Sequence, residues 1–514
     1  KDKQAGICRT EGDTNMKTML ERGAGILMPV SSLPSPYGIG TFGSAAYEFV
    51  DFLKKARQKY WQVLPVGPTS YGDSPYQSFS AFAGNPYFID LDTLVKEGLL
   101  TQDEINACYW GDNPTQVAYD AVFWYRFPLL KKAYARSEYR EEQGYEKFCM
   151  DSWFWLNDYA FYMALKFHFD NKEWLAWPED IRFRKKEAVD SYREELKDEI
   201  DFWKFLQYKF YQQWGKLRAY ANEQGISIIG DIPIYVALDS ADVWTHPELF
   251  LLDEENLTPL KVAGVPPDAF SETGQLWGNP LYRWDVQEKT DFAWWKERMK
   301  ASTRLYDVVR IDHFIGVTQY YAIPAGSEDG KTGEWLKGPG KKLTDAINMV
   351  IGDTKIIAED LGIFVPEVKE LLEETGYPGM KIIEFAFSGD RFNEHLPHMY
   401  SPNSVVYGGT HDNETLVGYF KPEARQWWEL QYIADYMGVS HQHEVVDKVL
   451  KTAYASVASV VIFQAQDILK LDSWARMNTP GTVGNNWRWR MKPGELTQDH
   501  INHLSWLVDT FGRF

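Results

Sequence analysis

The segment VVRIDHF, residues 308–314, gives the first indication of the fold. Its valines and isoleucine are typical of a strand buried in a parallel sheet, yet this strand ends among Arg310, Asp312 and His313. An unpaired buried charge is costly, so such residues are normally paired or exposed in a cleft. A salt bridge that closes the strand and a cleft that performs chemistry are both open explanations of this one motif.

Seven further runs resemble this one in being apolar or β-branched and in ending at turn-forming or polar residues. Continuous apolar strands separated by helical stretches are typical of a parallel sheet covered on both faces, and eight of them predict a (β/α)8 TIM barrel. The eight predicted strands lie within 25–33, 60–68, 226–234, 306–313, 355–362, 381–387, 404–413 and 460–469.

Uneven spacing between the runs predicts large, mostly helical insertions between barrel strands, at about 69–225 and 237–305. Phe202, Leu206, Phe210, Trp214 and Leu217 recur at helical spacing and predict the helix that closes the first insertion. We expect residues 16–514 to form a single catalytic barrel. Residues 1–15 have no apolar core, and we interpret them as a leader or cloning remnant.

The amino-acid composition argues against some classes of binding partner. The 514 residues carry a net charge of −19 with no dense basic cluster, which argues against nucleic acid and an anionic membrane surface as partners. No apolar run is long enough to cross a membrane. Three scattered cysteines fit neither a disulfide framework nor a thiolate metal site, and they favour a reducing compartment.

Four of the predicted strands end in carboxylates, namely Asp231, Asp312, Glu359 and Asp412. The carboxyl ends of barrel strands share one face, so we expect these groups to lie together. Neighbouring carboxylates separate their pKa values, which lets one remain ionised while another holds a proton, as glycosyl chemistry requires. Arg310 lies two residues before Asp312, hence on the same side of the strand.

Two alternatives for these carboxylates remain open. Loop acids often cap the helices that follow them, and octahedral Mg²⁺ or Mn²⁺ also binds carboxylates at the mouth of a barrel. The cation and histidines beside the acids, Arg310, His313 and His411, favour acid–base chemistry over a metal. We therefore expect no metal and no cofactor.

A series of motifs in this order resembles the amylase superfamily and, within it, the amylomaltase or disproportionating-enzyme family of 4-α-glucanotransferases. The departures from general α-amylases, which carry a C-terminal β-sandwich that we do not expect here, favour that family. The motifs are LMPVSSLPSPYGIGTFG (27–43), YGDSPYQSFSAFAGNPYFIDL (71–91), GDIPIYVALDSADVW (230–244), VAGVPPDAFSETGQLWGNPLY (262–282), VVRIDHF (308–314), IIAEDLG (356–362), GTHDN (409–413) and MNTPGT (477–482).

The resemblance implies three catalytic residues. Asp312 would be the nucleophile, Glu359 the general acid/base, and Asp412 a carboxylate that grips sugar hydroxyls and stabilises the distorted transition state. The remaining residues that it implies for substrate binding are Tyr76, Asp231, Gln275, Trp277, Arg310, His313, Asp360, His411 and Asn478.

Within that set, Tyr76 would stack on the donor sugar, and Gln275 and Trp277 would lie on a loop, around 262–282, that covers the site. Because turn residues flank Trp277 in GQLWGNP, we expect it outside any helix or strand. A ring that only packs against its own insertion is the simpler reading of Trp277.

The implied activity is retaining transfer of α-1,4-glucan segments from a maltooligosaccharide or starch chain to the 4-hydroxyl of an acceptor glucan or glucose. A maltodextrin hydrolase and a glucan-binding protein with an inactive barrel are the alternatives. The predicted partners are maltooligosaccharides, amylose and glucose, with the protein a monomer or homodimer. We expect it in the cytoplasm, or in a plastid if the source is a plant.

Overall fold

The computed structural model describes residues 19–267, 271–362 and 365–514; the predicted leader at 1–15 lies outside them. Eight parallel strands form one sheet in the order β10-β11-β12-β1-β2-β3-β6-β9. The Ala358 amide donates to the Pro378 carbonyl at 3.0 Å and joins the two end strands. The strands are β1 (Gly23–Leu27), β2 (Tyr60–Gln62), β3 (Ser227–Pro233), β6 (Val308–Asp312), β9 (Lys355–Ala358), β10 (Gly379–Ile382), β11 (Ser404–Tyr407) and β12 (Val460–Gln464).

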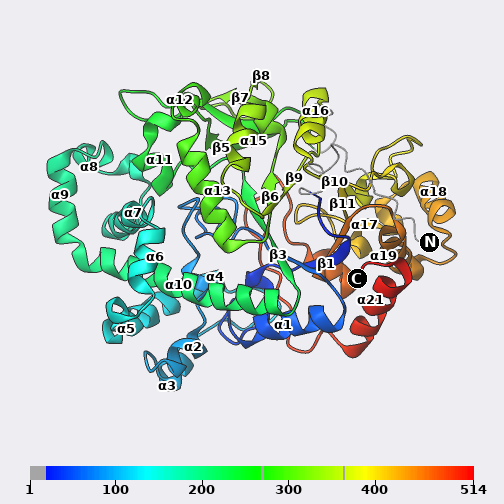
Figure 1. Cartoon of the computed structure of the whole chain (residues 1–514), viewed down its shortest axis with the longest axis horizontal. Helices are drawn as coiled ribbons and strands as arrows, with labels where there is room; N and C mark the ends of the chain where they lie inside the picture. The colour runs from blue at the N-terminus through cyan, green and yellow to red at the C-terminus, as the bar shows by residue number, and fades with distance from the viewer. Residues whose placement is uncertain (1–18, 268–270, 363–364) are drawn as a thin grey trace, which may run out of the picture.

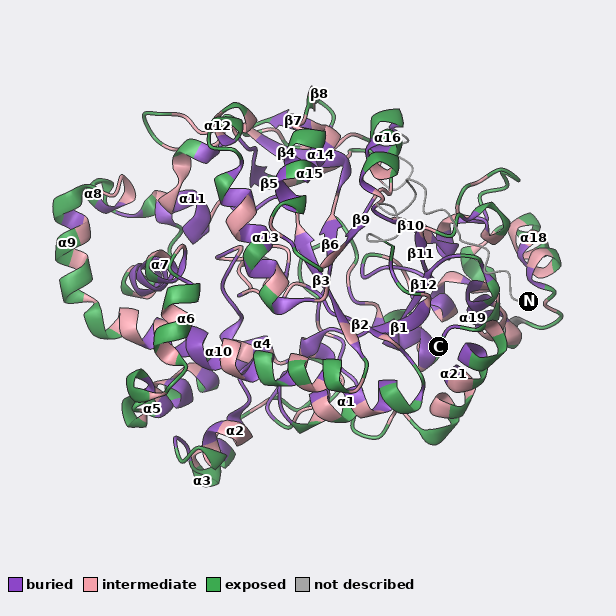
Figure 2. Cartoon of the chain, in the orientation of Figure 1, coloured by how far each residue is buried: buried purple, intermediate pink, exposed green. Residues whose placement is uncertain are grey.

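Each of the eight predicted runs overlaps a barrel strand, although β1 and β10 begin two residues before their runs, so the (β/α)8 prediction is confirmed. The strands are buried, whereas the surrounding helices carry one buried and one exposed face (Figure 2). These outer helices include α1 (Ser44–Lys55), α10 (Lys197–Glu223), α13 (Ala293–Leu305), α15 (Lys341–Asn348), α16 (Pro366–Thr375), α18 (Trp427–Met437), α19 (Val445–Ala455) and α21 (Gln498–Phe511) (Figure 1).

Residues between β2 and β3 are almost entirely helical and extend to one side of the barrel (Figure 1). The predicted closing helix is α10, whose five predicted apolar residues are all buried. Gly225 follows it with a φ of 81°, the left-handed geometry that ends many helices. The other helices of this segment are α2 (Leu91–Lys96), α3 (Gln102–Asn106), α4 (Tyr119–Ala121), α5 (Phe127–Arg136), α6 (Tyr145–Asp151), α7 (Leu156–His168), α8 (Glu179–Arg182) and α9 (Lys186–Glu195).

The segment between β3 and β6 is less helical than predicted. It holds α11 (Ala241–Thr245) and α12 (Trp284–Lys289) before α13, but also two strands, β4 (Lys261–Val265) and β5 (Gln275–Pro280). These join β7 (Gln319–Pro324) and β8 (Glu334–Lys337) in an antiparallel sheet of order β5-β4-β7-β8. The prediction missed this sheet because half-exposed antiparallel strands mix polar and apolar residues and do not read as continuous apolar runs.

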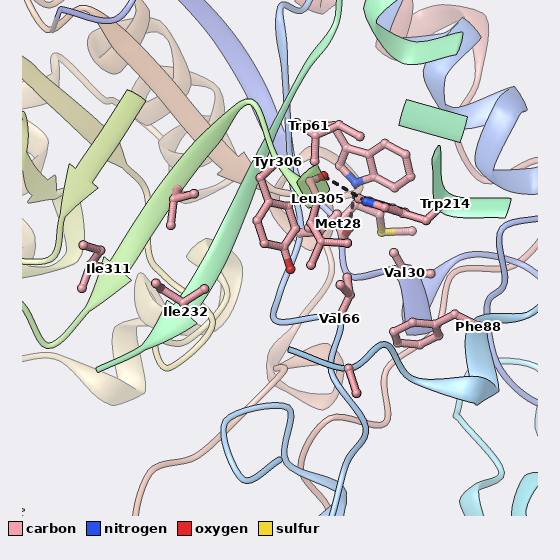
Figure 3. Packing of buried hydrophobic residues seen from close by; sticks show 14 of the residues in the cluster. Met28, Val30, Trp61, Val66, Phe88, Trp214, Ile232, Leu305, Tyr306 and Ile311 are labelled. Atoms are coloured by element: carbon pink, nitrogen blue, oxygen red, sulfur yellow. Dashed lines mark hydrogen bonds between the residues drawn. The ribbon is translucent and has the colours of Figure 1, made fainter. Parts of the chain in front are cut away.

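Aromatic rings fill the space between the barrel and α10 (Figure 3). The Trp61 indole donates to the Met28 carbonyl at 2.8 Å, and the Trp214 indole donates to the Leu305 carbonyl at 2.9 Å. Each large ring therefore buries its apolar surface while its single polar atom remains hydrogen-bonded. The first bond ties the end of β1 to β2 and the second ties the end of α13 to α10, which together help to fix the frame that carries the site.

Candidate active site

Arg310 lies at the centre of the site. Its Nη1 is 2.8 Å from both carboxylate oxygens of Asp231 and 2.8 Å from Oδ1 of Asp312. The register explains this geometry: Asp231 on β3 is opposite Arg310 on β6, and Asp312 is two residues farther along, so all three side chains point the same way. Although burial opposes the charge, the two aspartates raise the pKa of Arg310. The fixed guanidinium orients Asp312, whose side chain is 28% exposed.

Glu359 follows directly after β9 and is buried. Its Oε2 accepts a hydrogen bond from the backbone amide of His313 at 2.6 Å, and its Oε1 accepts one from Leu361 at 3.0 Å. Burial and the nearby charge of Asp312 raise its pKa to about 8, against the opposing effects of Arg310 and the two amides. Glu359 therefore holds a proton at neutral pH beside a carboxylate that is bound to a cation.

Asp412 lies in the turn that follows β11. Its Oδ1 accepts a hydrogen bond from the Asn478 amide at 2.6 Å, and its Oδ2 is 3.5 Å from Nε2 of His411. Although its side chain is 48% exposed, desolvation by the surrounding protein opposes ionisation, but His411 and Asn478 outweigh it and lower the pKa of Asp412 to about 2. Arg476, a residue that the sequence did not single out, donates to the Asp412 carbonyl at 2.7 Å. Asp412 is thus an ionised, oriented acceptor.

Tyr76 links the two sides of the site. Its hydroxyl donates to Asp231 at 2.8 Å and lies 3.1 Å from Nδ1 of His411. Its ring stacks on His411 at 4.6 Å between centroids, and both rings contact Trp487. Trp487 was missed, although it follows shortly after the MNTPGT motif that carries Asn478. The expected stacking of Tyr76 on a sugar stays a prediction.

Trp277 lies inside β5, so the expectation that it would stand outside any strand is wrong. The pairing of β4 with β5 contains a register shift. Gly278 takes up a φ of 77°, so the strand continues through a sequence that is otherwise typical of a turn. The indole donates to Gln275 at 3.1 Å and meets the ring of His313 edge to face at 4.8 Å. The expected covering loop is therefore largely a pair of strands, and its residues 268–270 lie outside the described part.

His313 has a backbone φ of 52°, which is uncommon for a residue other than glycine. This conformation turns the end of β6 so that the His313 amide reaches Glu359. Burial lowers the pKa of the imidazole to about 4, so the ring is neutral at pH 7. Its buried Nε2 has no hydrogen-bond partner among the described residues.

Asp360 stands apart from this network. Its Oδ1 accepts a hydrogen bond from the Met380 amide at 2.7 Å, which ties the segment after β9 to β10. Burial raises its pKa. This contact gives Asp360 a structural task, and its role in substrate binding stays a prediction.

Within residues 19–267, 271–362 and 365–514, no three His, Cys, Asp or Glu side chains are grouped so as to hold a metal ion. In the same residues, no helix has the length and apolar character needed to span a bilayer.

Comparison with known proteins finds 4-alpha-glucanotransferases and a solved amylomaltase structure. The 4-alpha-glucanotransferase of Clostridium butyricum is 49% identical over 486 residues, covering 95% of this chain and 100% of that protein. The 4-alpha-glucanotransferase of Streptococcus pneumoniae is 50% identical over 481 residues, covering 93% of this chain and 95% of that protein. Among solved structures, the amylomaltase from Streptococcus agalactiae in complex with acarbose superposes with a TM-score of 0.92 at 43% identity, covering 96% of this chain and 100% of that one. Residues 28–497 match the sequence profile described as 4-alpha-glucanotransferase, and this chain belongs to that family.

Proposed function

We propose that Asp312, Glu359 and Asp412 carry out the family's 4-α-glucanotransferase reaction as a retaining double displacement. Glu359 protonates the α-1,4 glycosidic oxygen while Asp312 attacks the anomeric carbon, which forms a covalent glycosyl–enzyme and releases the reducing-end piece. The observation that carries this assignment is the contrast between a buried, protonated Glu359 and an Arg310-bound Asp312. Asp412 accepts hydrogen bonds from hydroxyls of the distorted sugar.

In the second step, the deprotonated Glu359 takes the proton of an acceptor 4-hydroxyl, which attacks the glycosyl–enzyme and frees Asp312. The bond that forms is of the same type as the bond that broke, so the enzyme must favour a sugar hydroxyl over water. Trp277 and the β4–β5 pair, which contacts His313 through the Trp277 ring, supply the covering surface. The free Nε2 of His313 and the imidazole of His411 bind sugar hydroxyls.

The partners that we propose are maltooligosaccharides and amylose as donors, and these glucans or glucose as acceptors. The acarbose complex of the Streptococcus agalactiae amylomaltase supports a glucan-shaped site. A net charge of −19 is consistent with a neutral substrate. It does not favour nucleic acid or an anionic membrane as a partner, because both require a positively charged surface. We further propose a monomer or homodimer in the cytoplasm, consistent with the free thiols of Cys108 and Cys149.

Incubation with maltotriose alone separates this function from hydrolysis. Transfer yields glucose, maltose and chains longer than maltotriose while the total number of reducing ends stays constant. A hydrolase instead increases the number of reducing ends as maltotriose disappears and makes no longer chains. Asp312→Asn, which should retain the fold, is the control for both outcomes and loses turnover by several orders of magnitude.

A further inference from the structure

Three large aromatic side chains are exposed on two adjoining segments outside the active site. Phe392 is 80% exposed, Trp427 is 76% exposed and Trp428 is 44% exposed. Large apolar rings that gather on the surface mark a contact site more often than scattered ones do. We call these three residues the aromatic patch.

Phe392 is held in a defined turn. Its amide donates to the Asp390 carboxylate at 2.9 Å. The neighbouring Asn393 side chain donates to the Phe385 carbonyl at 2.7 Å and to Ser388 at 3.0 Å. The ring is therefore displayed from a hydrogen-bonded turn that is anchored directly after β10.

The two tryptophans lie in the first turn of α18, which is also fixed. Gln426 and Glu429 form a reciprocal capping box there. Arg425 stacks on Tyr419 at 3.5 Å and donates to its carbonyl at 3.0 Å.

Trp428 packs on the turn that carries Phe392. A Cβ at Gly389 would lie 3.2 Å from the Trp428 ring, and Arg391 stacks on Tyr432, one helical turn after Trp428. The three residues thus lie on two hydrogen-bonded elements that contact each other, so binding does not have to order the backbone that carries the rings.

The patch belongs to the active-site side of the barrel. The turn with Phe392 follows β10, and α18 follows β11 in the same connection that carries Asp412. Tyr419, between Asp412 and α18, donates a hydrogen bond to the Glu384 carbonyl and ties the two connections together. Both connections leave the carboxyl ends of their strands, so the patch continues the face on which the site opens.

We propose that the aromatic patch is an accessory binding surface for long α-1,4-glucan chains, separate from the reaction centre. This inference rests on the proposed function. Sugar rings present C–H faces that stack on aromatic rings without a charge. Charges of both signs lie beside the patch, with Asp390, Glu423 and Glu429 against Arg391 and Arg425, so no block of like charge is present to select an ion. A chain bound here occupies the patch while one of its ends occupies the site.

A subunit interface is the competing occupant. Rings of this size bury about 150–250 Å² each when fully covered. Three partly exposed rings therefore fall short of the roughly 800 Å² per partner of a stable interface. Among the neighbouring exposed residues, Glu423 and Gln426 are polar, whereas Pro422 and Ala424 are small and add no further large apolar side chain.

The test compares a long and a short substrate in the Phe392→Ala/Trp427→Ala variant, which leaves Trp428 packed on Gly389. The KM for amylose should rise roughly tenfold, while kcat/KM for maltotriose disproportionation stays within about twofold of the parent. Trp506→Ala removes a ring that is 50% exposed on α21 and is the matched control. It should change neither value.

Binding without turnover gives a second readout. In an Asp312→Asn background, retardation by amylose in a native gel should be lost with the double variant and retained with Trp506→Ala. Equal changes for amylose and maltotriose, or unchanged retardation, would overturn the proposal. So would a parent dimer that the double variant converts to a monomer with an unchanged KM for amylose. A parent that fails to disproportionate maltotriose would instead refute the proposed function.

Discussion

At the scale of single residues, the site gives two neighbouring carboxyl groups different electrostatic surroundings. Asp312 is bound to Arg310, whereas Glu359 is buried and accepts hydrogen bonds from two backbone amides. The left-handed backbone of His313 contributes to this arrangement, because it directs an amide toward Glu359 immediately after Asp312. Strained backbone of this kind is tolerated where the surrounding structure fixes it, often at functional sites.

The pH dependence of the first step follows from Glu359. Its pKa of about 8 means that the acid form predominates at neutral pH and is lost above pH 8. We expect kcat/KM for maltotriose to fall about tenfold per pH unit in the alkaline limb. Glycosyl fluoride donors, whose leaving group needs no proton, should lack this limb in pre-steady-state glycosylation. An identical alkaline limb for both donors would contradict the assignment of Glu359 as the acid.

The same carboxyl group affects stability. Its pKa is 4.5 when unperturbed and about 8 in the fold, so the folded state binds the proton more tightly. This contribution is fully present below about pH 4.5 and is lost as the pH rises toward 8. Glu359→Gln should therefore increase the free energy of unfolding at pH 8 by on the order of 1–3 kcal/mol relative to the parent, and not at pH 4. Denaturant titrations at pH 4 and pH 8 measure this difference in the free energy of unfolding. An equal effect at both pH values would show that the charge of Glu359 is not responsible.

At the scale of elements, the β4–β5 pair carries Trp277, the ring that we propose covers the site. Trp277 contacts His313, whereas its neighbour Leu276 points to the other face of β5 and is 40% exposed. Trp277→Ala should lower maltotriose disproportionation and raise the ratio of hydrolysis to transfer, with the melting temperature little changed. Leu276→Ala is the matched control and should leave the ratio unchanged. Proportional loss of both activities in Trp277→Ala would show that the ring is structural.

Close packing behind β3 gives a second prediction at this scale. A Cβ at Gly230 would lie 2.1 Å from the ring of Tyr306, which is buried. Gly230→Ala should therefore lower the free energy of unfolding by roughly 1–3 kcal/mol. The same substitution at Gly215, exposed in the middle of α10 with no atom within 4 Å of its Cβ, should raise it by about 0.5–1 kcal/mol. Chemical denaturation tests both signs, and a loss of stability in Gly215→Ala would contradict this packing argument.

At the scale of the whole molecule, the barrel was predictable because parallel strands buried on both faces read as continuous apolar runs. Asp231, Arg310 and Asp312 were predictable as neighbours because strand periodicity and barrel topology fix them. The sheet of β4, β5, β7 and β8 was not predictable, because it pairs segments that come before and after β6 in the chain and its strands are half exposed. The stack of Tyr76, His411 and Trp487 likewise depends on contacts between distant loops, which no local pattern records.

The most direct test of the account is detection of the glycosyl–enzyme. Glu359→Gln forms the intermediate from a maltosyl fluoride donor but resolves it slowly, because no base activates the acceptor. Mass spectrometry of the quenched protein should show one added maltosyl group, and peptide mapping should place it on Asp312. Asp312→Asn in the same background should show none. A protein that turns over the donor without an adduct, or with the adduct on another residue, would contradict the double displacement through Asp312.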